Sequence, residues 1–244
     1  MFKLFKSKPR LKDLITNNSF DFHSHLLYGL DDGAKNIDET KFLINSLNSL
    51  GFSELSTSPH TTPLIWDNTK NDIINQYEKV KTEIPELSAK VKLRTASEYL
   101  MDDSFLQRME SEKLLTVKDD YVLVEMSYMN PPMGLYDILF QLKSEGYQPI
   151  LAHPERYNFY KRDYPSFKRL KTAGCLFQLN ILSVTGYYGG GIAEVSDYLL
   201  KEGMYDFVGT DVHHQKHIEA FQSKVKVKNF HLIEKLLENN NILR

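Results

Sequence analysis

The chain has 244 residues, 41% of them hydrophobic, which suits either one α/β barrel or two small domains with a well-buried core. Its 30 basic and 32 acidic residues give a formal net charge of −2, which argues against nucleic-acid binding, because nucleic-acid-binding proteins normally carry a basic excess. The one cysteine, Cys175, excludes an internal disulfide and is typical of a cytoplasmic protein. No apolar run approaches the roughly 18 residues of a membrane span, so we expect no membrane-spanning helix.

The chain begins with a basic extension, which we place at residues 1–18, ahead of one domain at residues 19–244. Residues 1–12 are basic, are broken by Pro9, and lack the apolar segment and cleavage site of a secretory signal. We expect a solvated tail here, with contact to an anionic surface as the alternative.

Strands and helices are predicted to alternate along the rest of the chain. Residues 19–23 have the alternating aromatic residues of a short buried strand. Further strands are predicted at 53–58, 91–96, 121–126, 148–152, 175–180 and 207–210. Apolar residues at helical spacing predict helices at 37–50, 67–87, 135–146, 164–173, 192–202 and 230–238, and a short helix or turn is predicted at 102–110. Asn36 is expected to cap the first helix and Gly51 to end it. About seven β-α units without a linker indicate one parallel α/β domain, open or closed.

Side chains that bind metals follow the carboxyl ends of these predicted strands. His23 and His25 should project together, because residues i and i+2 of a strand share a face. A lone His-x-His pair is more often a loop histidine and a core histidine, but here the pattern recurs. The candidates are His23, His25, Asp32, His60, Glu98, Glu125, His153, Asp211 and His213. Because parallel strands end at a common rim, we expect these side chains to form one site.

Nine candidate ligands exceed the needs of one ion, so two or three metal ions are predicted, with Glu98 able to bridge two. Nitrogen and oxygen donors without a thiolate favour Mn²⁺, Fe or Zn²⁺ in a catalytic site over a structural zinc. Clustered ions suit displacement at phosphorus, because they polarise the phosphoryl oxygens and supply a hydroxide nucleophile. Arg156 could grip the phosphate, or instead form a structural ion pair. We assign catalytic roles to Arg156, Asp211 and His60.

Other features of the sequence point to less specific roles. Cys175 lacks the Cys-x5-Arg arrangement of thiol phosphatases, since the fifth residue beyond it is Asn180, and is predicted to be a buried thiol. The glycines at 189–191 lack the Lys and Ser of a P-loop and are read as a turn, with anion binding as the alternative. Loop or helix-surface positions are predicted for His214, His217 and His231, with contact to the substrate as the alternative for His214 and His217. Packing, or the border of a substrate mouth, is predicted for Trp66, Tyr187 and Tyr188.

The order of these motifs resembles the PHP (polymerase and histidinol phosphatase) superfamily, and within it the CpsB/YwqE-type bacterial tyrosine-protein phosphatases. The opening motif is Asp21-Phe22-His23-Ser24-His25, followed by Asp31-Asp32-Gly33-Ala34-Lys35. The order continues with Thr57-Ser58-Pro59-His60, Ala96-Ser97-Glu98-Tyr99, Val124-Glu125-Met126-Ser127, Ala152-His153-Pro154-Glu155-Arg156-Tyr157, Gln178-Leu179-Asn180 and Gly209-Thr210-Asp211-Val212-His213. The Asp-Asp-Gly loop and the His-Pro-Glu-Arg-Tyr stretch single out this branch.

The resemblance implies a distorted (β/α)7 barrel with a trinuclear, usually manganese-dependent site on the nine candidate ligands, and Arg156 as the phosphate-binding arginine. It also implies a phosphotyrosine protein as substrate, typically the tail of a tyrosine kinase that regulates capsule or exopolysaccharide synthesis. One departure is that Gln215-Lys216-His217 stands where the family often has a second arginine. Lys216 would supply charge there without a bidentate fork. The alternatives are a small-molecule phosphomonoesterase of the histidinol-phosphatase type, a nucleotide phosphoesterase, and a non-catalytic metal-binding partner of a kinase.

Overall fold

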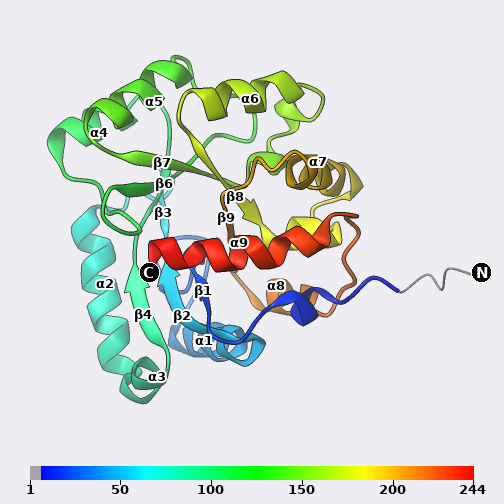
Figure 1. Ribbon diagram of the computed structural model, residues 1–244. Helices are drawn as coiled ribbons and strands as arrows, with labels where there is room; N and C mark the ends of the chain where they lie inside the picture. Colours follow the sequence, from blue (N-terminus) through cyan, green and yellow to red (C-terminus); the bar gives the residue numbers. More distant parts are fainter. Residues whose placement is uncertain (1–6) are drawn as a thin grey trace, which may run out of the picture.

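Parallel strands lie at the centre of the computed structural model, which describes residues 7–244, and helices surround them (Figure 1). Every pairing between the strands is parallel. The strands are β1 Ser19–Asp21, β2 Phe52–Thr57, β3 His60–Thr61, β4 Lys92–Thr95, β5 Glu98–Leu100, β6 Tyr121–Glu125, β7 Gln148–Ala152, β8 Leu176–Asn180 and β9 Phe207–Gly209.

The strands form two sheets, ordered β1-β2-β4 and β3-β5-β6-β7-β8-β9, that join into one barrel. Two residues separate β2 from β3 and β4 from β5, and Glu98 N still donates to Pro59 O across this interruption (3.1 Å). On the other side, Asp211 N donates to His23 O (2.7 Å) and thereby joins β9 to β1. With β2–β3 and β4–β5 each taken as one broken strand, the predicted distorted (β/α)7 barrel is confirmed.

The helices cover the outside of this barrel (Figure 1). They are α1 Ile37–Leu50, α2 Lys70–Glu83, α3 Pro85–Lys90, α4 Phe105–Ser111, α5 Leu135–Ser144, α6 Tyr164–Thr172, α7 Gly190–Lys201, α8 Gln215–Ala220 and α9 Ile233–Asn239. Asn36 caps α1 by accepting from the backbone of Asp38 and Glu39, and Gly51 ends the helix at a φ of 117°, as predicted.

Two helix predictions need correction. The single helix expected at 67–87 is two helices, because Pro85 has no N–H to continue α2 and instead starts α3. A turn is predicted at Gly190 and Gly191, but these residues form the first positions of α7. This helix therefore begins before the predicted residue 192.

A small apolar cluster fills the inside of the barrel, and the predicted metal-binding side chains lie above it. Leu123 on β6 and Ala96 before β5 belong to this cluster. Glu125 and Glu98 follow them by two residues, so they continue on the same face, toward the barrel's interior. The larger apolar cluster includes Val122 and Val124, which point the other way, toward the helices. The alternation of the strands therefore turns the carboxylates inward.

The described part of the basic extension packs against the barrel. Leu11, in a short 3-10 helix at Leu11–Leu14, is fully buried, and its N–H donates to Ser223 O (2.9 Å). The expected solvated tail is therefore wrong at this residue, because an apolar side chain gains by burial. Residues 1–6 of that tail lie outside the described residues, and the division at residue 19 stays a prediction. Across residues 7–244, no helix is both long and apolar enough to cross a membrane.

Candidate metal centre

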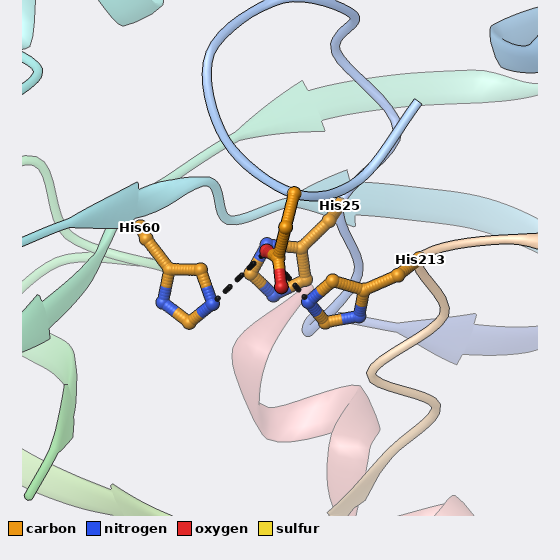
Figure 2. Close-up of side chains that lie close together, drawn as sticks. His25, His60 and His213 are labelled. Atoms are coloured by element: carbon orange, nitrogen blue, oxygen red, sulfur yellow. Dashed lines mark ion pairs between the residues drawn. The ribbon is translucent and has the colours of Figure 1, made fainter. Parts of the chain in front are cut away.

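All nine predicted ligand residues lie together at one end of the barrel. One ligand atom from each places them in four overlapping groups, in which the atoms lie within 4.8 Å of one another. The groups are His23, His25 and Asp211; His23, Glu98 and His153; His60, Glu98 and Glu125; and His25, Asp32, His60 and His213. Figure 2 shows the rings of His25, His60 and His213 gathered around one point. The structure thus brings the nine side chains together, and their role as ligands stays a prediction.

His60 and Glu98 reach this cluster in a way that the sequence did not predict. Both were expected after the end of a strand, whereas His60 begins β3 and Glu98 begins β5. Between β2 and β3, and between β4 and β5, the two chain segments remain joined by backbone hydrogen bonds, so a second strand begins after each two-residue break. His60 and Glu98 are paired in register, and His60 Nδ1 lies 3.2 Å from Glu98 Oε2.

Hydrogen bonds orient the histidine rings. The Nδ1 atom of His23 bonds to Gln178 Oε1 (2.9 Å), and that of His25 to Asp31 Oδ2 (2.7 Å). Because these oxygens only accept, both Nδ1 atoms donate, and Nε2 is left to face the centre. The two Nε2 atoms lie 3.4 Å apart, and each lies 3.4 Å from Asp211 Oδ1.

Asp31 and Gln178, which are not among the predicted site residues, orient two of the predicted ligands. Asp31 is buried and also accepts from His60 N (3.0 Å), whereas its neighbour Asp32 is half-exposed. The doubled aspartate was a signal, but only one of the two was assigned a role. Gln178 stands in the Gln178-Leu179-Asn180 motif, but its contact with His23 could not be read from the sequence, because the two residues are 155 positions apart.

The loop that carries Asp31 and Asp32 approaches His25 closely at Gly33. A Cβ atom on Gly33 would lie 2.3 Å from the carbonyl oxygen of His25 and 2.6 Å from its Cβ. Only glycine fits such a gap without displacing backbone. The glycine of the Asp-Asp-Gly loop therefore lets both carboxylates reach the histidines.

The histidines and carboxylates of the centre shift one another's pKa values toward their charged forms. Burial opposes the charged form of His60, but the carboxylates of Glu125 and Glu98 outweigh burial and raise the pKa of His60 to about 9. Burial likewise opposes the ionisation of Glu98, but His23 and His60 outweigh it and hold the Glu98 pKa well below its usual value. Carboxylates that hold protons on neighbouring imidazoles form a site where divalent cations can replace those protons.

Buried atoms without partners provide a test of whether metal ions fit here. Among the described residues, eight buried side-chain polar atoms have no hydrogen bond, and three of them belong to predicted ligands: His60 Nδ1, Glu98 Oε2 and His153 Nδ1. Buried polar atoms are almost always paired, so the unpaired atoms of these ligand residues need an explanation. Metal coordination supplies it for His60 and Glu98, whose unpaired atoms face the centre. The residues fit a cluster of ions with nitrogen and oxygen ligands.

Arg156 lies beside Asp211 and forms the ion pair that was the alternative to phosphate binding. Its Nη1 donates to Asp211 Oδ2 (2.7 Å), and its guanidinium carbon lies 5.0 Å and 4.2 Å from the ring centres of Tyr128 and Tyr188. Asn180 Nδ2 donates to the same Asp211 oxygen (2.8 Å). The guanidinium still lines the cavity above the centre, so the ion pair and a phosphate contact are compatible.

His153 and Asp211 have left-handed backbones, with φ angles of 37° and 51°. Such values are uncommon for residues other than glycine and concentrate at functional sites. They turn the chain sharply after β7 and β9, directly at the rim where the two side chains enter the centre.

A cavity of about 400 Å³ opens above the centre. Trp66 lines it and stacks on His60, with the ring centres 5.1 Å apart. Lys216 is exposed on α8 and does not line the cavity. His217, predicted at the surface, is buried, because its Nδ1 accepts from the backbone N–H of His213 (3.1 Å). Cys175 is buried as predicted, and burial raises the pKa of its thiol to about 12.

Fold and site together define a parallel α/β barrel with a buried cluster of potential metal ligands at the end where its strands terminate. Residues 19–235 match the family described as capsular polysaccharide synthesis, CpsB/CapC. The chain belongs to this family.

Relatives agree with this assignment, and solved structures share the fold. CapC of Staphylococcus aureus is 26% identical over 201 residues, which cover 79% of this chain and 76% of that protein. YwqE of Bacillus subtilis, a tyrosine-protein phosphatase, is 24% identical over 218 residues, covering 88% and 82%. A crystal structure from work on YwqE and on CpsB of Streptococcus pneumoniae, described as metal-dependent tyrosine phosphatases, matches with a TM-score of 0.79 at 22% identity, covering 92% and 93%. An amidohydrolase from Mycoplasma synoviae matches with a TM-score of 0.53 at 12% identity, covering 98% and 99%. These similarities confirm the fold.

Proposed function

We propose that the chain is a metal-dependent phosphatase that hydrolyses phosphotyrosine in proteins. The observation that carries the proposal is a set of nine nitrogen and oxygen ligand residues beneath a cavity that Arg156 also lines. The relatives named as tyrosine-protein phosphatases support the reaction, and the family's description supports a role in capsular polysaccharide synthesis. The proposed substrate is a phosphorylated tyrosine kinase of that process, and the proposed location is the cytoplasm.

The nine residues of the centre would hold two or three ions, with Mn²⁺ as the first candidate and Fe or Zn²⁺ as alternatives. Glu98 is the proposed bridge, because its Oε1 lies 3.1 Å from His153 Nε2 while its Oε2 lies 3.2 Å from both His23 Nε2 and His60 Nδ1. Bound ions of this kind polarise phosphoryl oxygens and activate water at neutral pH.

Arg156 supplies the fixed positive charge for the substrate phosphate. One of its nitrogens is engaged by Asp211, and the flanking rings of Tyr128 and Tyr188 restrict the plane of the guanidinium. An arginine fixed in this way loses little freedom when it binds an anion and stabilises charge that develops on the phosphoryl oxygens. Asp211 orients Arg156, and His60 lies against the cavity floor beside Trp66.

The test is the hydrolysis of a phosphotyrosine peptide by metal-stripped protein to which Mn²⁺, Fe²⁺ or Zn²⁺ is added back. Histidinol phosphate serves as the parallel small substrate. We expect metal-restored activity that is higher on the peptide. Activity restored only on histidinol phosphate would support the metal site but reject a phosphotyrosine protein as the substrate. Tight metal binding without turnover of either ester would leave the non-catalytic alternative.

Asp211→Ala provides the matched test of the centre. We expect a folded protein, judged by circular dichroism, whose activity falls by at least a hundredfold, because both Arg156 and the ligand set lose a partner. Asp103→Ala removes an exposed carboxylate and should leave the activity unchanged. Wild-type activity in folded Asp211→Ala would rule out this centre as the catalytic site.

A further inference from the structure

Two loops wall the cavity above the metal centre with apolar side chains. Ile65 and Trp66, between β3 and α2, form what we name the first wall. Tyr128 and Met129, between β6 and α5, form the second wall. The charged residues that line the cavity, among those the structure describes, are Arg156 and predicted metal ligands. The cavity therefore has a charged floor and apolar walls.

The walls expose large apolar side chains. Ile65 is 67% and Met129 84% exposed. Exposed apolar groups next to a charged site have no role in the barrel's core, and water around them is released when an apolar group of a ligand covers them. The side chains that would make this contact are thus already in place at the mouth.

Both walls are attached to the floor. Thr62 and Trp66 exchange two backbone hydrogen bonds (2.9 and 2.8 Å), which close the first loop, and Trp66 stacks on His60. Tyr128 lies on Arg156 and stacks on His153, with the ring centres of Tyr128 and His153 5.8 Å apart. Each wall therefore rests on residues of the floor through one aromatic side chain, Trp66 or Tyr128.

We propose that Ile65 and Met129 are specificity-determining residues: on the two walls they form an aryl-binding cleft, which gives the site its preference for aromatic over short alkyl phosphomonoesters. The inference rests on the proposed function, since it places the phosphate on the metal centre and Arg156. A phenyl ring attached to that phosphate reaches the walls and buries apolar area on both sides. A methyl or serine-sized group stays near the floor and leaves the walls in water.

Two non-hydrolysable ligands, phenylphosphonate and methylphosphonate, test the cleft without any contribution from leaving-group reactivity. Trp66 is the only tryptophan of the chain, so its fluorescence reports binding directly. In Zn²⁺-loaded protein we expect phenylphosphonate to bind roughly tenfold more tightly than methylphosphonate, the lower range for a group in an apolar pocket. In the double variant Ile65→Ala, Met129→Ala the preference should fall to about twofold, with methylphosphonate binding unchanged.

The same loops provide matched controls. Leu64 is fully exposed and Met133 is 80% exposed, and neither lines the cavity. The double variant Leu64→Ala, Met133→Ala should keep the wild-type preference. Equal binding of the two phosphonates by the wild type, or a preference that survives in Ile65→Ala, Met129→Ala, would overturn the proposal. A preference for phenylphosphonate in a protein that hydrolyses no phosphomonoester would instead leave the cleft standing and reject the phosphatase function.

Discussion

Asp31 shows how much of the centre depends on residues that are not among the nine predicted ligands. Its Oδ2 accepts from His25 Nδ1 and His60 N, and its Oδ1 accepts from Gly33 N (2.9 Å). Burial opposes its ionisation, but His25 outweighs burial and holds the pKa of Asp31 below its usual value. One carboxylate thus positions two histidines and the loop that carries Asp32.

Asp31→Asn should lower the affinity for metal roughly tenfold to a hundredfold, because an amide can present its NH₂ to His25 Nδ1 and no longer fixes the tautomer that leaves Nε2 free. Competition with a chromogenic chelator measures the affinity. Asp38→Asn, an exposed aspartate at the start of α1, is the control. An unchanged affinity in Asp31→Asn would show that the ring of His25 is held by other contacts.

Gly33→Ala should destabilise the protein by roughly 1–3 kcal/mol and weaken metal binding, because the new Cβ would meet the backbone of His25 at 2.3 Å and push the loop outward. Urea unfolding with and without Zn²⁺ separates the two effects. Gly190→Ala is the matched control, since nothing lies within 4 Å of its Cβ position. Equal stability of the two variants would contradict the close packing of this loop.

At the level of elements, the first helix and the broken strands place the site. Thr40 on α1 donates to Leu26 O (2.7 Å), which ties the helix to the segment that follows His25. The interruptions after β2 and β4 let His60 and Glu98 enter the barrel at the same height. The helix α1 and the interrupted strands, none of which has an unusual sequence pattern, thus set the spacing of the predicted ligands.

Asn36→Ala should cost about 1 kcal/mol of stability, because two N–H groups at the start of α1 lose the side chain that accepts from them. The metal affinity should change little, since α1 remains tied to the barrel through Thr40. Thermal unfolding and chelator competition measure the two quantities. Asn45→Ala, within the same helix and exposed, should be neutral or slightly stabilising. A large loss of metal affinity in Asn36→Ala would mean that the helix start controls the centre directly.

At the level of the whole molecule, protons and metal ions should compete for the same charges. The pKa of His60 is raised to about 9 in the metal-free protein, so His60 carries a proton at pH 7 to 8. That proton stabilises the metal-free protein fully below the unfolded pKa of about 6.5, and this contribution is lost as the pH rises through about 9. Metal binding requires neutral imidazole, so the affinity for metal increases over the same pH range.

The difference in Tm between Zn²⁺-loaded and metal-free protein should therefore widen from pH 6.5 to pH 9, and metal binding near pH 7 should release protons. Differential scanning fluorimetry across this range gives the Tm values. Calorimetry in two buffers of different ionisation enthalpy gives the number of protons released. A constant Tm difference, together with no proton release, would contradict protonation of the metal-free centre.

Local pattern was enough to predict much of this protein. The spacing of apolar residues predicted the β-α order, and Asn36 and Gly51 bounded α1 by their own chemistry. The ends of parallel strands share one rim, so the nine candidate ligands could be named from their positions along the chain, and the structure gathers all nine.

Which residues orient and enclose the nine candidate ligands depends on the tertiary structure. Gln178 meets His23 across 155 positions, and Asp31 meets the backbone of His60 across 29, so neither contact has a local signal. The apolar walls join loops from separate β-α units, whose side chains read as ordinary exposed residues along the chain. The reason is that spacing along a strand or helix fixes which face a side chain occupies, whereas the partner it meets depends on closure of the barrel.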